Sequence, residues 1–172
     1  MNEEAPEQIF LSRELLDVMR DSARIALECR EPFITVRSLL LALLNDPHTG
    51  PALAGTISRE KLDAYEAAGD AIARMTASRV PEPHMPPGER PAMLRFNTLA
   101  FKVPDGSRSV WLSREALSAF AEGARRVDEG ALYAPKHLAF GVAADAIRAP
   151  GLLSALHIEP GAVTDAVTKA NA

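Results

Sequence analysis

The chain has 172 residues, of which 47% are hydrophobic, 24% charged and 5% aromatic, and its formal net charge is −4. A mildly acidic chain with well-mixed charges lacks the basic surface that nucleic-acid binding requires, so that class is excluded. The longest apolar run, Leu39–Leu44, is far shorter than the roughly 20 residues of a membrane-spanning helix. The N-terminus has no basic and apolar regions typical of a secretion signal, and Cys29 has no second cysteine with which to form a disulfide. These observations predict a cytoplasmic protein with neither a membrane nor a nucleic-acid partner.

Residue composition and proline placement predict a helical chain in two parts. Ala, Leu, Glu and Arg, all good helix formers, are frequent. Five prolines fall between Pro81 and Pro91, and because each removes a backbone N–H and clashes with the preceding turn, no helix crosses this stretch. We therefore expect one domain over residues 1–172, made of a first half at 9–76, a Pro-rich connector at 77–109 and a second half at 110–170.

The two halves contain similar segments. Leu11–Glu14 recurs as Leu112–Glu115, a separation of 101 residues. Behind both segments the apolar residues continue at helical spacing. We interpret this pattern as an internal duplication, which predicts an all-α fold of two pseudo-symmetric helical-bundle repeats.

In the first half, Ser12 is placed to cap a helix over residues 12–30, because a serine oxygen can accept an N–H from the first turn. A second helix is expected to begin at Thr35. Its leucines at 39–44 cover most of the circumference, so this helix is expected to be central and buried. After a turn at 45–47 and a short segment, a last helix is expected from Ser58.

The end of the connector alternates apolar and other residues over 99–103 and again over 109–112. Between them lies Pro104–Gly106, a turn sequence, and alternation on both sides of a turn is typical of a β-hairpin. An extended loop whose apolar residues cover the repeats is the alternative, and the sequence leaves both open.

The second half repeats the helical pattern of the first. Ser113 is placed to cap a helix over residues 113–129, and Pro135 suits the first position of the next helix, where its missing N–H costs nothing. A last helix is expected after Pro160.

None of the residue patterns that carry catalysis is complete. The segment Gly50–Thr56 has the glycine spacing of a phosphate-binding loop but lacks its lysine, so a turn is the better interpretation. Cys29 has no histidine or asparagine signature beside it, which favours a structural cysteine over a nucleophile. The sequence thus predicts no enzyme, no cofactor and no metal site, because the four histidines lack ligand spacing: His48, His84, His137 and His157.

Two capped helices per half, with the leucine-rich segment Ile34–Leu44 in the first half and His137–Leu138 in the second, resemble the Clp repeat. That repeat forms the N-terminal domain of Clp-type AAA+ unfoldases, and the chain contains no ATPase module. The resemblance implies a module that recognises substrates or adaptors, so the implied partners are proteins or peptides of a Clp protease system. A structural accessory that docks on the protease or unfoldase and tunes its assembly is the alternative, and an undetected hydrolase is a third hypothesis.

The resemblance also points to candidate binding residues. In some relatives an acidic residue just before the histidine of the leucine-rich motif helps to bind phosphoarginine, whereas Arg37 and Lys136 occupy the matching positions here. Because the charge is reversed, we expect weak or absent phosphoarginine binding and a partner with an acidic patch, unless these positions have simply drifted at the surface. Ser12 and Ser113, which helix capping already explains, are the remaining candidates.

Overall fold

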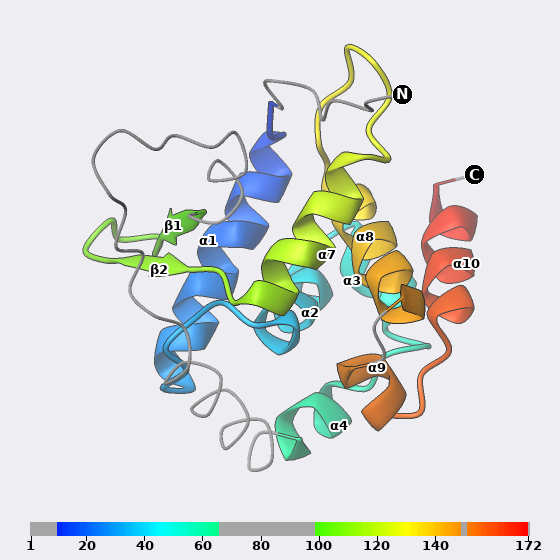
Figure 1. Ribbon diagram of the computed structural model, residues 1–172, viewed down its shortest axis with the longest axis horizontal. Helices are drawn as coiled ribbons and strands as arrows, with labels where there is room; N and C mark the ends of the chain where they lie inside the picture. The colour runs from blue at the N-terminus through cyan, green and yellow to red at the C-terminus, as the bar shows by residue number, and fades with distance from the viewer. Residues whose placement is uncertain (1–9, 66–98, 149–150, 172) are drawn as a thin grey trace.

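The computed structural model describes residues 10–65, 99–148 and 151–171. Within these ranges the chain is mostly helical, with one short antiparallel hairpin (Figure 1), which confirms the predicted helical class and the hairpin. The part of the first half after residue 65 and the connector up to residue 98 lie outside the described residues. The elements are α1 (Arg13–Glu28), α2 (Val36–Asn45), α3 (Thr49–Leu53), α4 (Arg59–Ala64), β1 (Ala100–Lys102), β2 (Ser109–Trp111), α7 (Arg114–Ala124), α8 (Pro135–Arg148), α9 (Leu152–Ala155) and α10 (Pro160–Ala170).

The helices begin where local capping chemistry predicts. The side chains of Ser12, Thr35, Ser58 and Ser113 each accept a backbone N–H from the first turn of the helix that follows. Pro135 is the first residue of α8, as expected from its fixed φ angle. These predictions are confirmed.

Two helices end earlier than predicted, and the phosphate-loop-like segment is not a simple turn. α1 stops at Glu28 because Arg30 adopts a left-handed φ of 56°, and the Glu31 N–H then bonds to the carbonyl of Ala26. α7 stops at Ala124, since the N–H groups of Arg126 and Val127 bond three residues back and tighten the last turn. Thr49–Leu53 forms the short helix α3.

The leucine-rich helix α2 is central, as predicted. Leu39, Leu40 and Leu43 are fully buried. α2 packs against α1, α3, α4, α7 and α8, so its neighbours come from both halves of the chain. Figure 1 shows α2 behind α1 and α7. No helix in the described ranges is both long enough and apolar enough to cross a bilayer.

The hairpin lies beside α1. Phe101 pairs with Val110 across the two strands, and both side chains are buried, while their strand neighbours Lys102 and Ser109 are exposed. The turn places Gly106 at a φ of 74°, which glycine adopts without strain. One face of this small sheet therefore completes the core.

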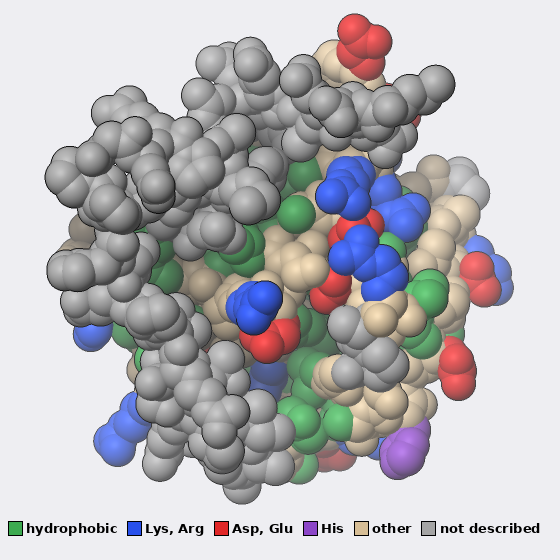
Figure 2. All heavy atoms as spheres, in the orientation of Figure 1, with side chains coloured by type: hydrophobic (Ala, Val, Ile, Leu, Met, Phe, Trp, Pro, Cys, Tyr) green, Lys and Arg blue, Asp and Glu red, His purple; other side chains and the backbone are tan. Residues whose placement is uncertain are grey.

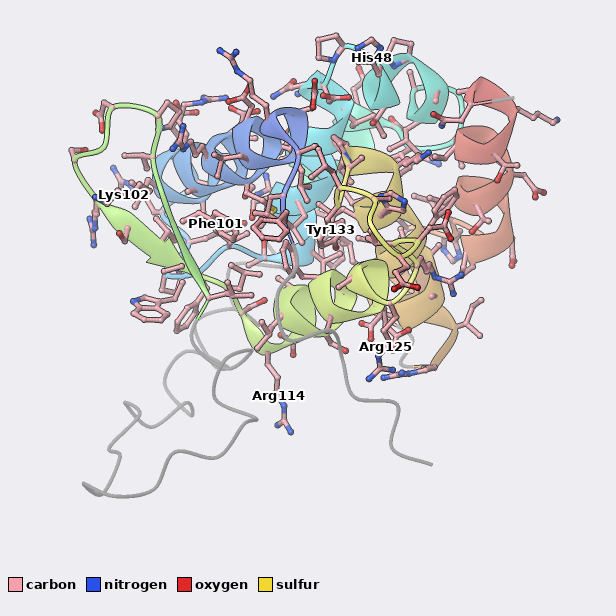
Figure 3. The ribbon with its side chains drawn as sticks, turned by 90° about the horizontal axis from the view of Figure 1, so that it is seen from above. His48, Phe101, Lys102, Arg114, Arg125 and Tyr133 are labelled. Atoms are coloured by element: carbon pink, nitrogen blue, oxygen red, sulfur yellow. The ribbon has the colours of Figure 1, made fainter. Side chains whose placement is uncertain are left out.

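α7 and α8 cross at a point that only small residues permit. A Cβ on Gly141 would lie 2.4 Å from the backbone nitrogen of Gly123, and one on Gly123 would lie 2.6 Å from the His137 carbonyl oxygen. Beside this crossing, the buried Tyr133 hydroxyl donates to the Phe120 carbonyl at 2.8 Å. The Phe120 ring lies 4.8 Å from that of Tyr133, so aromatic packing fixes the start of α8 against α7 (Figure 3).

Candidate functional site

Two helix starts from different halves of the chain lie side by side at an isolated parallel bridge between Leu11 and Tyr133. The Ser12 N–H donates to the Tyr133 carbonyl at 2.9 Å, and the Tyr133 N–H donates to the Phe10 carbonyl at 2.9 Å. Since α1 begins just after Ser12 and α8 just after Ala134, this bridge sets their N-terminal turns next to each other. We call this the α1–α8 start.

A second parallel bridge joins Ile34 to Leu112 and repeats the arrangement. The Ser113 N–H donates to the Ile34 carbonyl at 2.8 Å, and the Ile34 N–H donates to the Trp111 carbonyl at 2.8 Å. This bridge brings together the first turns of α2 and α7, and we call it the α2–α7 start. Each start therefore combines one helix from each half.

The two predicted serines sit at these starts as helix caps. The Ser12 oxygen accepts the Leu15 N–H at 3.1 Å, and the Ser113 oxygen accepts the Ala116 N–H at 3.1 Å. Ser12 is 6% exposed. Capping accounts for both hydroxyl groups, as the sequence indicated.

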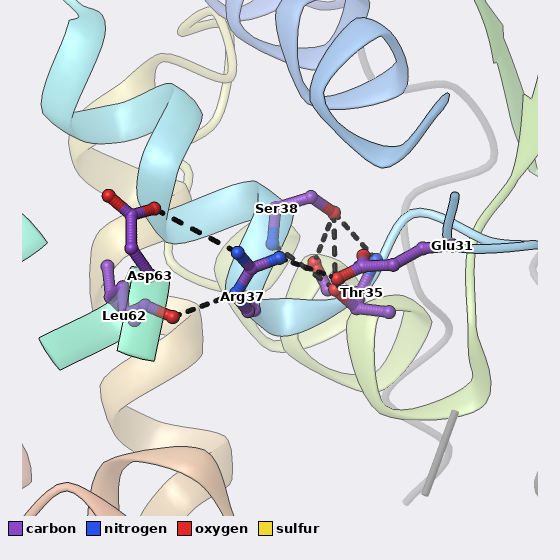
Figure 4. A network of polar contacts seen from close by, with 6 residues as sticks. All are labelled: Glu31, Thr35, Arg37, Ser38, Leu62 and Asp63. Atoms are coloured by element: carbon purple, nitrogen blue, oxygen red, sulfur yellow. Dashed lines mark hydrogen bonds and ion pairs between the residues drawn. The ribbon is translucent and has the colours of Figure 1, made fainter. Parts of the chain in front are cut away.

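Arg37, the predicted binding residue of α2, lies in the interior (Figure 4), with a side chain only 5% exposed. Its Nη1 bonds to Glu31 Oε1 at 2.7 Å, and its Nε donates to the Leu62 carbonyl at 2.9 Å. Asp63 approaches the same guanidinium at 3.9 Å. Arg37 thus joins the end of α1, the start of α2 and α4.

The surroundings of Arg37 keep it charged although it is buried. Burial acts against the charge, but hydrogen bonding to Cys29 and Glu31 outweighs it and raises the pKa of Arg37. The Thr35 hydroxyl donates to the second oxygen of Glu31 at 2.8 Å, so the paired carboxylate is held as well. The carboxylate that Arg37 binds belongs to the chain itself, a partner that sequence reasoning did not foresee.

Lys136, the matching residue of the second half, has a different environment. It is the second residue of α8 and is half-buried, and no carboxylate of the described residues forms an ion pair with it. His137 beside it is 7% exposed and accepts the Ala134 N–H at Nδ1, 3.0 Å away. Burial, with the charge of Lys136, lowers the pKa of His137, while the charge of Asp128 opposes that shift.

Exposed apolar side chains lie at both starts, and sequence reasoning missed them. Phe10 is 67% exposed and Leu132 is 54% exposed, and each directly precedes one residue of the Leu11–Tyr133 bridge. Trp111, 47% exposed, precedes Leu112 in the same way at the other bridge. The signal was available, because Phe10 and Trp111 both stand two residues before a capping serine.

A cavity lined by described residues lies elsewhere, between α1 and the end of α2. It has a volume of about 310 Å³ and contains none of the four predicted binding residues. Within the described ranges no three His, Cys, Asp or Glu side chains gather to hold a metal ion. Four of the nine residues that line the cavity are acidic: Glu14, Asp17, Val18, Asp21, Ala42, Asn45, Asp46, Pro47 and His48.

Comparison of the chain with models of protein families and with curated proteins gave no match. The resemblance to the Clp repeat therefore rests on the residues quoted above.

Proposed function

We propose that this chain is a non-enzymatic protein-binding module resembling the Clp N-terminal domain, which recognises substrates or adaptors for a Clp protease system. The observation that carries the proposal is the α1–α8 start. There two exposed apolar residues, Phe10 and Leu132, directly precede the two bridged residues, and the half-buried cation Lys136 follows Tyr133 by three residues, in the first turn of α8. Exposed apolar residues that are rimmed by polar groups mark protein-binding surfaces.

The proposal includes duplication of one helical unit. The hydrogen bonds of the two starts support it. Ser12 donates its N–H to Tyr133, two residues before α8 begins, and Ser113 donates its N–H to Ile34, two residues before α2 begins. Both pairs also have a bond in the opposite direction, from Tyr133 to Phe10 and from Ile34 to Trp111. Reciprocal bonding of this kind is what two copies related by a pseudo-twofold axis require.

The chemistry of the α1–α8 start favours an acidic group on the partner. Lys136 supplies a positive charge, and the first turn of α8 adds the positive end of a helix dipole. A guanidinium is disfavoured there by like charge. Arg37 is left out of this surface, because its guanidinium already binds Glu31.

Calorimetric titration with free phosphoarginine tests the ligand side of the proposal. We expect weak or absent binding to the chain, and tight, saturable binding that survives Lys136→Glu would contradict the assignment of Lys136.

Binding to purified Clp unfoldase and adaptor proteins tests the partner side. We expect Phe10→Ser with Leu132→Ser to weaken capture of the partner, since both side chains are exposed and their loss leaves the core intact. Trp111→Ser, at a residue that is 47% exposed at the α2–α7 start, is the matched control for loss of an exposed apolar side chain. Equal capture by the unchanged chain, the double variant and the control variant would rule out this role, and so would a failure to capture any Clp component.

A further inference from the structure

Arg125 and Arg148 lie together on either side of Glu122, and Arg126 follows Arg125 in the chain. Arg125 caps the C-terminus of α7, Arg126 follows it, and Arg148 is the last residue of α8. All three are exposed. Figure 2 shows Lys and Arg side chains gathered over this part of the surface, with acidic side chains between them.

Glu122 holds two of these arginines together. One of its oxygens, Oε1, accepts Nη1 of Arg125 at 3.0 Å and also Nη1 of Arg148. The Glu122 side chain is only 13% exposed, whereas those of Arg125 and Arg148 are 64% and 59% exposed. The carboxylate therefore lies beneath, and the guanidinium groups face solvent with donors to spare.

Stabilisation of the fold is a sufficient reason for Arg125 and Arg148 to be arginines. A cation at a helix C-terminus is favoured by the helix dipole, which suits Arg125 and Arg148, and exposed ion pairs add about 0–1 kcal/mol. Arg126 lies beyond the end of α7 and forms no ion pair with any carboxylate of the described residues. Asp145, one turn before Arg148, accepts the Ser118 hydroxyl instead.

We infer that Arg125, Arg126 and Arg148 form a docking site for an acidic segment of a partner protein. A guanidinium binds a carboxylate through two parallel N–H groups, and Glu122 holds two of the guanidinium groups in place before binding, which reduces the ordering cost. Ile147, 70% exposed beside Arg148, offers an apolar contact for the same segment.

The partner is a protein segment because the positive area is small. Three arginines on a chain of net charge −4 provide too few phosphate contacts for nucleic acid, whereas a short run of Asp and Glu matches them. Arg148 of this site lies away from the cation of the α1–α8 start. Lys136 and Arg148 stand at opposite ends of α8, which at 1.5 Å rise per residue places them about 18 Å apart along the helix axis.

The test uses the full chain and a fluorescein-labelled peptide of glutamates and leucines, with binding followed by fluorescence anisotropy. We expect saturable binding that weakens when the salt concentration rises from about 50 to about 300 mM. Arg126→Glu with Arg148→Glu should weaken it about tenfold or more. Arg126→Glu alone should also weaken it, and since that residue has no ion pair among the described residues, this variant keeps the fold.

Two controls separate this site from other surfaces. Arg20→Glu reverses an exposed arginine on α1, and Lys136→Glu reverses the cation of the α1–α8 start, and neither should change the affinity for the peptide by more than about twofold. Absence of saturable binding, equal loss in all variants, or loss with Lys136→Glu alone would overturn the inference. Tighter binding of a single-stranded oligonucleotide than of the peptide would overturn the choice of partner.

Discussion

Replacement of Arg37 by methionine tests whether the buried ion pair holds the first half of the chain together. Methionine keeps the length of the aliphatic stem but removes the 2.7 Å bond to Glu31 and the 2.9 Å bond to the Leu62 carbonyl. Glu31, whose side chain is 4% exposed, would then be a buried charge without its guanidinium. Loss of one partner of such a pair costs about 3–5 kcal/mol of unfolding free energy.

Urea unfolding followed by circular dichroism measures this loss, and a second variant identifies its cause. Arg37→Met combined with Glu31→Gln leaves no buried charge, so we expect it to recover much of the stability lost by the single variant. Arg24→Met is the surface control. The Arg24 side chain is 40% exposed and pairs with Glu28 and Asp21, whose side chains are 62% and 24% exposed. Its loss should cost clearly less than that of Arg37, since exposed ion pairs contribute about 0–1 kcal/mol each. A loss below about 1 kcal/mol for Arg37→Met, or a double variant less stable than the single one, would refute the reasoning.

Three further variants probe the core and its pH dependence. Leu40→Ala should lower the unfolding free energy by about 2–5 kcal/mol in urea, because it leaves a cavity where a fully buried side chain packs. Gly141→Ala should be destabilising in thermal unfolding, since the added Cβ would lie 2.3 Å from a carbonyl oxygen of α7, whereas Gly161→Ala, with no atom within 4 Å, should be neutral or stabilising. The lowered pKa of His137 means that the unfolded chain takes up a proton first, so stability should fall as pH drops below about 6.5, and less steeply in His137→Gln. Equal pH profiles for the two proteins would contradict this role of His137.

The sequence was sufficient wherever the structure depends on neighbours along the chain. Ser12, Thr35 and Ser58 cap helices through bonds to residues three positions away, so the sequence shows both partners. The hairpin is also local, because Phe101 pairs with Val110 across a short turn. Alternation alone nevertheless left an extended loop as the alternative, and the structure decides for the hairpin.

The environment of Arg37 was not predicted, because it depends on residues far apart in the chain. Its bond to the Leu62 carbonyl spans 25 residues. The sequence nevertheless contained a clue, since a helix with leucines around most of its circumference has little exposed surface on which to place a charge. A charged residue near the start of such a helix needs a partner within the chain, and Glu31 is the nearest preceding carboxylate that could provide one.

The difference between Arg37 and Lys136 has its origin in the residue six positions before each of them. Glu31 stands there in the first half, and its carboxylate neutralises Arg37 inside the fold. Gly130 stands there in the second half, at a φ of 78°, and offers Lys136 no carboxylate. Under the proposed duplication, one copy therefore supplies its own counter-ion, whereas among the described residues the other does not. A positive charge at a helix start attracts an external anion fully only where the chain has not already paired that charge with a carboxylate. For this reason the proposed binding surface is placed at the α1–α8 start and not at the α2–α7 start.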